Sequence, residues 1–487
     1  MYYLARIHEM TASDRLQKRL TKIVCTLGPA CFSPDQLEGL VKSGMNVARL
    51  NLTHASAKKQ LPIVHLVKEI RSKHPIGVGI LLDVRCAQVR TGVVEKPIMI
   101  AKGQEVCFGV EKLRKESEKH AFVNVDYPAF GKDVRKAEIL LLDNGEMSFD
   151  IVSISKSGLV KAKARQDGTI GSRRHVNMPG ADISLPTFTD ADWEDIETAA
   201  EEGVDFLAIS FIRTGKDIAD VQAFLRKKKS PIRVMAKIET RQAVANFKDI
   251  LRESDAIMVA RGDLGAELPF EQVPVIQDEI VAQCRAAGKP VVVATHMLES
   301  MIEHPLPTRA EVTDVAHAAT IRTDTTMLSG ETASGRHPLV AVDAMDRILR
   351  ATEQHLREVD GQDMPAVTSD VEARAQSAVL LARSVGASAI VVMTKSGKSA
   401  EAISKFRPMI PIIAITDDET IWSQLSLHYG VSSLLCSFKG ELEDSVIRGM
   451  KEAVGAGLLG EGDEVVLVTG TEITGGSVIS IQAREVR

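Results

Sequence analysis

Residues 233–265 read RVMAKIETRQAVANFKDILRESDAIMVARGDLG. Two short, almost continuously apolar runs, 233–239 and 256–262, are separated here by a stretch with helical periodicity. Apolar runs that do not alternate with polar residues are typical of parallel strands buried on both faces. Both runs end in polar residues: Lys237-Ile238-Glu239 closes the first, and Arg261-Gly262-Asp263-Leu264-Gly265 closes the second. The stretch therefore predicts a strand–helix–strand unit with chemistry at the ends of its strands.

The same unit recurs along the chain. Eight such runs occupy residues 22–28, 46–51, 77–84, 206–211, 233–239, 256–262, 290–295 and 325–331. Amphipathic helical stretches lie between most of them, for example 33–43, which opens on Ser-Pro and stops before Gly44, and 190–203, which follows a Thr189 cap. A third helix is expected to stop at Gly288. Eight strand–helix alternations predict an α/β fold of the (β/α)8 TIM-barrel type.

Two parts of the chain depart from this pattern. Residues 91–177 hold short strands and turns, which predicts a small β domain inserted after the third barrel strand. After a polar linker at 360–370, the runs AIVVMT, PIIAIT, VSSLLC and EVVLVT alternate with helical stretches and predict a second, open α/β sheet. We therefore expect an N-terminal extension (1–20), a barrel (21–90 and 178–350), an inserted β domain (91–177) and a C-terminal α/β domain (351–487).

Composition excludes several classes of protein. The 487 residues are 44% hydrophobic and 26% charged, which is ordinary for a folded domain and unlike a disordered chain. A net charge of −5 and 4% aromatic residues disfavour a general nucleic-acid binder. No apolar run approaches the roughly 18 residues of a membrane helix, and the first residues lack a signal-peptide core. The six cysteines form no CxxC pair, which indicates buried, reduced thiols and a cytoplasmic protein.

Polar residues gather where the predicted strands end, which in such barrels is where the chemistry takes place. In chain order they are Arg49 to His54, Asp83, Arg90, Lys237, Glu239, Arg261 to Gly265, Thr295, His296 and Ser329 to Glu331. Lys237 and Glu239 are two residues apart on one strand, so their side chains share a face. With Asp263 from the next strand, Glu239 makes a pair of carboxylates suited to Mg²⁺. A structural Lys237–Glu239 ion pair is the alternative interpretation.

The remaining motifs indicate an anionic substrate. Glycines in the turn at 261–265 let backbone N–H groups approach an anion. Arg49, Arg90, Lys237 and one metal ion would then suit a phosphorylated carboxylate. His54 and His296 are either bases or hydrogen-bonded structural residues. The sequence contains neither a GxxxxGK[ST] phosphate loop nor the context of a Ser/His/Asp triad.

At these residues the chain closely resembles the pyruvate kinase family. The stretches that carry the resemblance run in order from Thr21 to Ser399: TKIVCTLGPA, GMNVARLNLTH, VNMPGADISLP, AKIE, IMVARGDLGAELP, ATHMLESM, PTRAEVTDVA, MLSGETASG and TKSGKSA. The resemblance implies a barrel with an inserted lid domain, a C-terminal effector domain and a homotetramer. It implies phosphoryl transfer from phosphoenolpyruvate to ADP, giving pyruvate and ATP through a metal-stabilised enolpyruvate that is then protonated.

The resemblance also implies roles for single residues. Arg49 and Arg90 would contact substrate phosphates, and Lys237 would stabilise the transferring phosphoryl group and the enolate. The amides around Arg261, Gly262 and Asp263, with Thr295, would hold the substrate carboxylate. Glu239 and Asp263 would ligate Mg²⁺ or Mn²⁺. Thr295, Ser329 and Glu331 would relay the proton, and Asn51, His54, Arg90 and Arg174 would contact the nucleotide. Asn51, Thr53, Asp83 and the Val84 carbonyl would bind K⁺.

The chain departs from the family pattern in places. It reads LDVRCAQVRTG at 82–92 where the family usually has LDTKGPEIRTG, so Gln88 replaces a glutamate whose charge goes with K⁺ dependence. Arg174 stands for a usual lysine and His296 for a usual glutamine. These changes leave Lys237 and the two metal carboxylates in place. We therefore expect the family's reaction, with a weaker dependence on K⁺.

The turn Thr394-Lys395-Ser396-Gly397-Lys398-Ser399 follows an apolar strand and precedes a helix, a combination suited to binding phosphate. An ordinary polar turn is the alternative. In the family this turn binds the phosphate of an allosteric effector, here through Thr394, Lys395, Ser396, Gly397 and Ser399. The late segment 469–477 is expected to be a loop, and it carries Glu472 but no Lys or Arg. The expected effector is therefore a monophosphate rather than a bisphosphate.

Two other functions are compatible with the same residues. A metal-dependent barrel enzyme acting on pyruvate enolates, such as an aldolase, would share Glu239 and Asp263 but would need no nucleotide. A decayed homologue would sense a metabolite through its last domain, although the intact AKIE and RGDLG stretches argue against decay.

Overall fold

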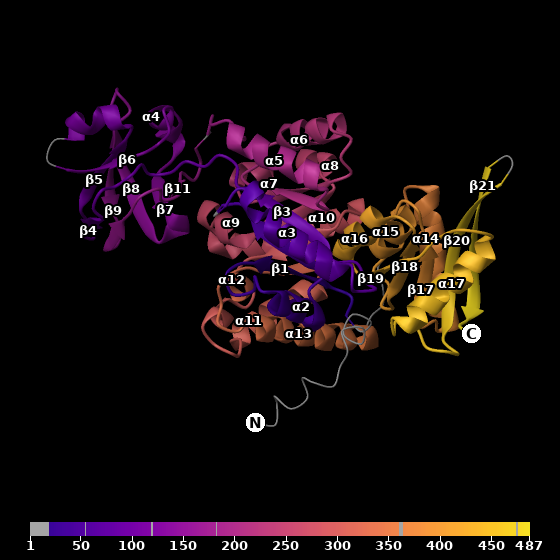
Figure 1. Cartoon of the computed structure of the whole chain (residues 1–487). Helices are drawn as coiled ribbons and strands as arrows, with labels where there is room; N and C mark the ends of the chain where they lie inside the picture. The colour runs from indigo at the N-terminus through magenta and orange to yellow at the C-terminus, as the bar shows by residue number, and fades with distance from the viewer. Residues whose placement is uncertain (1–18, 54, 118–119, 182, 360–363, 474–475) are drawn as a thin grey trace.

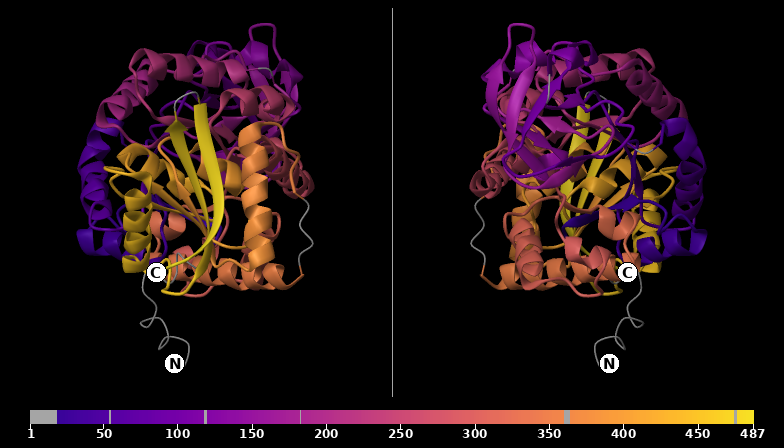
Figure 2. Two further views of the ribbon diagram at one scale, coloured as in Figure 1. Left: turned by 90° about the vertical axis from the view of Figure 1, so that its right-hand side faces the viewer. Right: turned by 90° about the vertical axis from the view of Figure 1, so that its left-hand side faces the viewer.

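The computed structural model describes residues 19–53, 55–117, 120–181, 183–359, 364–473 and 476–487. Three bodies stand in a row, with the inserted domain at one end, the barrel in the middle and the C-terminal domain at the other end (Figure 1). Figure 2, which looks along this row from either side, shows the C-terminal sheet in front of one end of the barrel and the inserted strands in front of the other. In the part of the chain that is described, no helix combines the length and apolarity needed to cross a bilayer.

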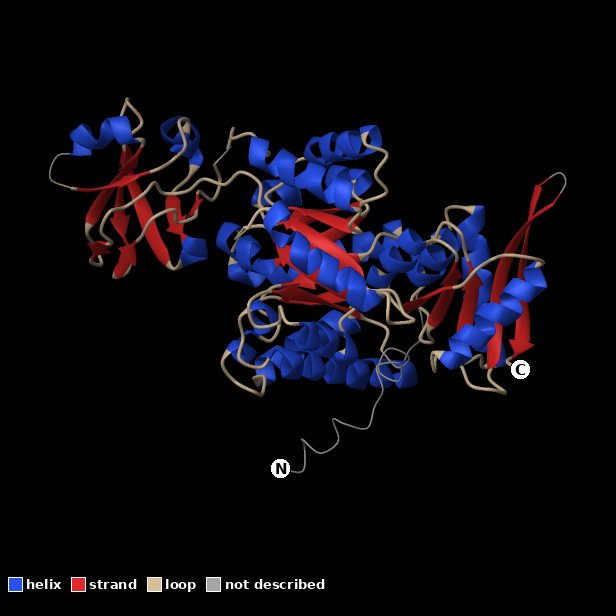
Figure 3. Cartoon of the chain, in the orientation of Figure 1, coloured by secondary structure: helices blue, strands red, loops and turns tan. Residues whose placement is uncertain are grey.

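The central body is the predicted barrel of eight parallel strands. In spatial order they are β1 (Lys22–Leu27), β16 (Thr325–Leu328), β15 (Val291–Ala294), β14 (Ala256–Ala260), β13 (Arg233–Ile238), β12 (Phe206–Ile209), β3 (Gly79–Val84) and β2 (Val47–Asn51), which pairs with β1 and closes the ring. All eight fall within the predicted runs. Figure 3 shows these strands enclosed by helices.

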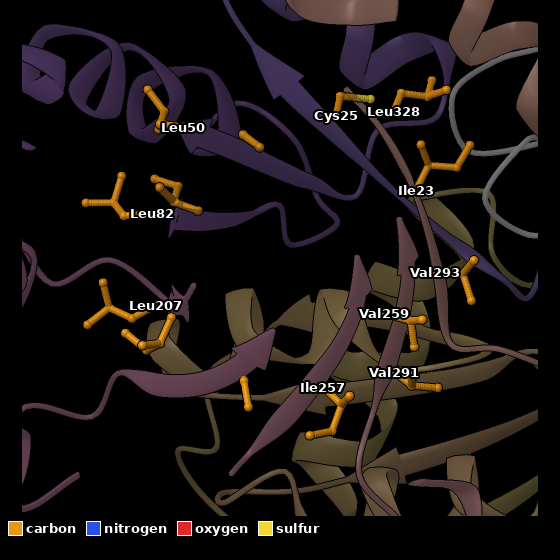
Figure 4. Packing of buried hydrophobic residues seen from close by; sticks show 14 of the residues in the cluster. Ile23, Cys25, Leu50, Leu82, Leu207, Ile257, Val259, Val291, Val293 and Leu328 are labelled. Carbon is orange, nitrogen blue, oxygen red and sulfur yellow. The ribbon is translucent and has the colours of Figure 1, made fainter. Parts of the chain in front are cut away.

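The strands are apolar on both faces because each face meets its own core. Alternate residues such as Ile23, Leu50 and Leu207 face outward into the cluster under the helices (Figure 4). The residues between them, such as Val24 and Met235, fill the barrel interior. This alternation with period two fixes which side chains at the strand ends reach the mouth of the barrel.

Capping residues set the ends of the helices as the sequence predicted. Helix α2 (Pro34–Ser43) begins after Ser33, whose side chain accepts the Gln36 N–H, and ends at Gly44 in the left-handed region. Thr189 forms a capping box at the start of α5 (Asp190–Glu202). The other barrel helices are α3 (Ala57–Arg71), α6 (Gly215–Lys227), α7 (Arg241–Ala245), α8 (Phe247–Glu253), α9 (Arg261–Glu267), α10 (Val273–Ala287), α11 (Arg309–Thr320), α12 (Gly330–Ala333) and α13 (Pro338–Val359).

The inserted domain has its own sheet and core. Its six-stranded sheet runs β11 (Val176–Asn177), β7 (Ile139–Leu142), β8 (Met147–Ile154), β9 (Val160–Ala164), β5 (Glu105–Gly109) and β6 (Ala121–Asn124). Strands β4 (Ile98–Ile100) and β10 (Gly168–Ile170) form a second pair, and α4 (Phe130–Asp133) lies between β6 and β7 in sequence. Phe108, Phe130 and Phe149 are fully buried in a cluster separate from the barrel core.

The C-terminal domain is the predicted open α/β sheet. Its order is β19 (Val431–Leu435), β18 (Ile412–Thr416), β17 (Ala389–Met393), β20 (Glu464–Ile473) and β21 (Gly476–Glu485), with helices α14 (Asp370–Val385), α15 (Lys398–Lys405), α16 (Glu419–Gln424) and α17 (Leu442–Gly455). The first four strands match the predicted runs, and the antiparallel β21 was not predicted.

Two details of the C-terminal half correct the sequence analysis. Helix α13 runs through the expected boundary between residues 350 and 351 and continues to Val359, because no glycine or proline interrupts it. Within the expected loop at 469–477, residues 469–473 and 476–477 belong to a ribbon, since β20 and β21 pair from Glu464 and Glu485 to Ile473 and Gly476. Its polar, glycine-containing sequence concealed the strand pairing.

The C-terminal domain closes the end of the barrel at which the strands begin. Leu427, in the short helix η6 (Leu425–Leu427), packs with Val24 and Met327 in the barrel interior. Thr325, at the start of β16, donates its hydroxyl to the Leu427 carbonyl at 2.9 Å. The described part of the C-terminal domain does not cover the opposite end of the barrel, where the strands finish (Figure 1). All six cysteines are free and buried, as expected.

Candidate active site

A cavity of about 420 Å³ opens at the C-terminal ends of the barrel strands. Its lining residues come from the barrel and from the inserted domain: Arg49, Asn51, Thr53, Gln88, Arg90, Asp143, Glu146, His175, Ser210, Phe211, Lys237, Glu239, Met258, Ala260, Asp263, Thr295 and Met327. The structure therefore brings most of the predicted site residues together around one space.

The inward face of the strands explains why these side chains meet. Met235 belongs to the barrel interior, so Lys237 and then Glu239 continue the same face of β13 up to the mouth. In the same way Arg49 follows Val47 on β2. The apolar interior changes to charged residues only in the last layer, where the cavity begins.

Lys237 is held in a cage of oxygen atoms. Its Nζ lies 2.8 Å from Glu239 Oε1, 3.3 Å from Asp83 Oδ1 and 2.8 Å from Ser210 Oγ, to which it donates a hydrogen bond. Only 8% of Lys237 is exposed. Burial alone would lower its pKa, but the carboxylates of Asp83 and Glu239 outweigh burial and hold the pKa above its ordinary value. The ammonium is therefore charged at neutral pH and directed at the cavity.

Arg49 shares the Asp83 carboxylate from the opposite side. Its Nε and Nη2 lie 2.9 and 2.7 Å from Asp83 Oδ2, and its Nη1 donates to Thr26 Oγ1 at 2.7 Å. Burial raises the pKa of Asp83, but Lys237 and Arg49 more than offset this, so the pKa is lowered. Asp83 thus fixes two cations side by side at the floor of the cavity.

Glu239 and Asp263 form the predicted pair of carboxylates. Glu239 is fully buried, and its Oε2 accepts the Phe211 N–H at 2.7 Å. Burial raises the pKa of Glu239 and the nearby Asp263 raises it further, against the opposing effect of Lys237. Both residues line the cavity, so negative charge is concentrated there.

The donor set fits a divalent cation. Among the described residues, Glu239 Oε1 accepts no hydrogen bond of ordinary geometry, although the Lys237 ammonium is close. The described part of the chain holds no group of three or more His, Cys, Asp or Glu arranged for a metal ion. Two carboxylates completed by substrate oxygens and water are a usual arrangement for Mg²⁺.

A hydrogen bond joins the turn after β14 to the residue that follows β15. The Gly262 N–H donates to Thr295 Oγ1 at 2.8 Å. Thr295 and His296 both have positive φ, 67° and 54°, which is unusual above all for the β-branched Thr295 and is often found at functional sites. The Arg261 side chain points away from the cavity, to the Thr295 carbonyl at 2.6 Å and to Asp314 at 2.6 Å.

Ser329 and Glu331 lie behind this turn and do not line the cavity. Glu331 is buried, and its two oxygens accept the backbone N–H groups of Leu298 at 3.0 Å and Ser329 at 2.7 Å. Burial raises the pKa of this carboxyl group. Glu331 therefore supports the segment that follows Thr295.

The predicted nucleotide contacts are only partly assembled. Arg90 lines the cavity, and its guanidinium donates to Gln88 Oε1 and, at 2.9 Å, to the Arg173 carbonyl. Arg174, in the inserted domain, is half exposed and pairs with Asp143 at 2.8 Å without lining the cavity itself. His54 lies outside the described residues.

The predicted K⁺ ligands lie at the ends of β2 and β3. Asn51 and Thr53 line the cavity, and Asn51 Oδ1 accepts the Thr53 N–H at 3.0 Å. The Asp83 carboxylate is engaged by Arg49 and Lys237, as described above. The Val84 carbonyl accepts the Ser210 N–H at 3.3 Å.

Several residues around the cavity were not predicted. Ser210 links Lys237 to Asp83, since its hydroxyl also donates to Asp83 Oδ1 at 3.1 Å, and Phe211 supplies the N–H to Glu239. Both follow β12, which like β1 is a strand whose end supplied no candidate residue in the sequence analysis. The inserted domain contributes Asp143, Glu146 and His175. No periodic signal marks these three, because only folding brings them to the barrel.

The phosphate-binding turn predicted in the C-terminal domain forms a compact bend. Thr394 Oγ1 accepts the Gly397 N–H at 3.0 Å, and Gly397 has a φ of 78° at the start of α15. Lys395 and Ser396 are exposed, whereas Ser399 is half-buried. The turn therefore offers a lysine and hydroxyl groups to solvent.

Comparison with known proteins identifies the family. Sequence models of the pyruvate kinase barrel domain and of the pyruvate kinase alpha/beta domain match residues 18–342 and 372–480. This chain belongs to the pyruvate kinase family. It is thus a phosphotransferase, and the expected fold and enzyme class are confirmed.

Individual relatives give the same answer. Over 474 residues the chain is 39% identical to plastidial pyruvate kinase 3, chloroplastic, of Arabidopsis thaliana, an alignment that covers 95% of this chain and 81% of the relative. It is 37% identical over 462 residues to pyruvate kinase of Geobacillus stearothermophilus, covering 94% and 78%. A crystal structure of a pyruvate kinase from Cryptosporidium parvum superposes with a TM-score of 0.87 at 32% identity, covering 99% of each chain.

Proposed function

We propose that the cavity carries out phosphoryl transfer from phosphoenolpyruvate to ADP, with Lys237 as the central catalytic group. The observation that carries this proposal is the charged Lys237 ammonium held between Asp83 and Glu239 at the cavity floor. Phosphoryl transfer depends more on alignment and charge neutralisation than on covalent help. The first alternative, an aldolase, would need no nucleotide, so a dependence of the reaction on ADP separates the two. The intact Lys237–Glu239 pair beside Asp263 argues against the second alternative, a decayed homologue.

The residues divide the work by position. Lys237 faces the transferring phosphoryl group and, after transfer, the enolate oxygen, while Arg49 beside it binds a phosphate oxygen. The backbone N–H groups at Arg261, Gly262 and Asp263 and the Thr295 hydroxyl hold the substrate carboxylate. Thr295 with a water molecule delivers the proton to the enolpyruvate carbon, and Ser329 and Glu331 support it from behind. Asn51, His54, Arg90 and Arg174 contact the nucleotide.

Glu239 and Asp263 would hold the Mg²⁺ or Mn²⁺ ion. Bound there, the cation supplies positive charge that neutralises the substrate oxygens during transfer. The inserted domain at 91–177 acts as the lid, since Asp143, Glu146 and His175 already border the cavity and water exclusion strengthens its electrostatics.

Asn51, Thr53, Asp83 and the Val84 carbonyl form the proposed K⁺ site. The Gln88 amide is neutral and accepts a hydrogen bond from Arg90. We therefore propose activation by K⁺ that is weaker than a glutamate at this position would give. Initial rates in tetramethylammonium buffer, with and without KCl, measure it; complete dependence on K⁺ would remove Gln88 from the explanation.

Regulation is proposed to act through the turn at 394–399, whose helix is tied to the catalytic strand. Glu401 on α15 pairs with Arg233 at 2.6 Å, and Arg233 begins β13, the strand that carries Lys237. Arg233 also donates a hydrogen bond from Nε to Gln424 Oε1 at 2.9 Å, and its Nη1 lies 3.3 Å from His428 Nε2. A phosphate bound at the start of α15 would shift this contact and so the substrate affinity.

Assembly and location complete the proposal. A homotetramer would cover some of the large apolar side chains that the single chain exposes, such as Phe270, Val275, Leu306 and Val312. Light scattering of the purified protein gives the mass directly, and a monomer at micromolar concentration would exclude this arrangement.

A cytoplasmic location fits the buried free thiols, whereas two plant relatives are named chloroplastic. Cell fractionation decides between these compartments.

Replacing Lys237 by Met should abolish turnover while the protein stays folded. Methionine has a similar volume, so packing changes little, but the loss of a charge aimed at a developing anion costs on the order of 2.7–4 kcal/mol, or about 10²–10³ in kcat. A coupled assay of pyruvate release measures the rate, and circular dichroism checks the fold. Near-normal turnover in the folded variant would contradict the assignment.

Glu239→Gln and Asp263→Asn should each shift the Mg²⁺ and Mn²⁺ activation curves to much higher concentration. Each removes one anionic oxygen ligand from a site that has two carboxylates. Initial rates over a metal titration give the half-saturating concentration. Asp314→Asn is a matched control, because that carboxylate pairs with the Arg261 side chain outside the cavity. A parental curve for either test variant means that its residue is not a ligand.

The effector should be a sugar monophosphate or nucleotide monophosphate, and it should lower the phosphoenolpyruvate concentration for half-maximal rate. A second phosphate would find no Lys or Arg in the segment 469–477. The candidates, with fructose 1,6-bisphosphate, are titrated at sub-saturating phosphoenolpyruvate. Ser396→Asp and Ser399→Asp should remove activation by charge repulsion, whereas Ser384→Asp, at an exposed serine on α14, should not. Activation that is best with the bisphosphate, or that survives both substitutions, would refute the proposal.

A further inference from the structure

His175 ties the inserted domain to the rim of the barrel. It follows Arg174 at the edge of β11 and lines the active-site cavity. Its backbone is fixed on both sides: its N–H donates to Asp143 Oδ1 at 3.2 Å, its carbonyl accepts the Asp143 N–H at 3.1 Å, and it forms a β-bridge with Arg90. The backbone of His175 is thus fixed by Asp143 within the inserted domain and by the segment that enters this domain at Arg90.

The imidazole packs against Phe211 of the barrel. The two ring centroids are 5.2 Å apart at an interplanar angle of 74°, an edge-to-face contact. Both residues also border a second, smaller cavity beside the active site. The contact therefore joins two bodies whose cores are separate.

Phe211 has an unusual backbone that serves Glu239. Its φ is 48°, in the left-handed region that a bulky residue adopts only at an energetic cost. In this conformation its N–H donates to Glu239 Oε2 at 2.7 Å. Hydrogen bonds to a buried carboxylate both satisfy it and fix its orientation. The His175 ring packs against Phe211 from outside the barrel and so restricts how this residue can relax.

We propose that His175 is a positioning residue for the divalent-cation site, acting through Phe211. Packing of the imidazole keeps Phe211 in the left-handed conformation, the Phe211 N–H then orients Glu239, and the contact between the inserted domain and the barrel thereby sets the affinity for the metal ion. The inference rests on the proposed role of Glu239 as a metal ligand. The Asp263 carboxylate also acts on the imidazole, so the test has to separate the effect of the aromatic ring from that of its nitrogen atoms.

The test measures Mn²⁺ binding to the full-length protein without substrate, by electron paramagnetic resonance of the free ion. His175→Ala should weaken Mn²⁺ binding about 5-fold or more, a factor that corresponds to roughly 1 kcal/mol. His175→Phe keeps an aromatic edge at the same place and should bind Mn²⁺ within about 2-fold of the parent. His120→Ala, at a partly exposed histidine of the same domain that faces Glu105, is the matched control and should bind as the parent does.

A double-mutant cycle checks the route through Phe211. If His175 acts through that ring, adding His175→Ala to Phe211→Ala should weaken Mn²⁺ binding no further. Parental binding by His175→Ala, an equal loss in His175→Phe, or additive effects in the cycle would each overturn the inference. These outcomes are distinct from failure of the proposed function, in which the parent itself would form no pyruvate from phosphoenolpyruvate and ADP.

Discussion

Closure of the eight parallel strands is the constraint on which the rest of the molecule depends. A closed ring has no free edge, and because helices cover its outside while side chains fill its inside, the side chains of every strand alternate between two cores. Ile23, Leu50 and Leu207 pack outward under the helices, while Val24, Val47 and Met235 fill the interior. The same alternation carries Arg49, Lys237 and Glu239 to the mouth, so the packing rule that makes the core also places the charges.

Charges at that mouth are tolerated because they neutralise one another. Asp83 is nearly fully buried, and it touches Arg49 on one side and Lys237 on the other. An unpaired charge at this depth would cost several kcal/mol. Glu239 is the exception in the balance, since Asp263 adds a second negative charge beside it. The excess of negative charge at this one point is the physical reason for placing a divalent cation there.

The two flanking domains act on opposite ends of the same strands. Leu427 fills the end of the barrel at which the strands begin, and Glu401 forms an ion pair with Arg233 at the start of β13. At the opposite end the His175 ring packs against Phe211, whose N–H donates to Glu239 directly after β13. Because β13 is a buried strand paired on both sides, it cannot adjust at one end independently of the other. This strand is the physical basis for the proposed coupling of both flanking domains to Lys237 and Glu239.

Sequence alone determined the local pattern: eight apolar runs, the caps at Ser33 and Thr189, and the polar residues at the strand ends. These depend on neighbours within a few residues, so periodicity and residue type suffice to find them. It missed β21 and the continuation of α13, where polar composition or a linker obscured the element. Only the tertiary structure decided that Ser210 joins Lys237 to Asp83, that Glu331 supports the Thr295 turn, and that His175 reaches Phe211. Those contacts join residues far apart in the chain, and their side-chain directions are set by closure of the barrel and docking of the inserted domain, which no local pattern records.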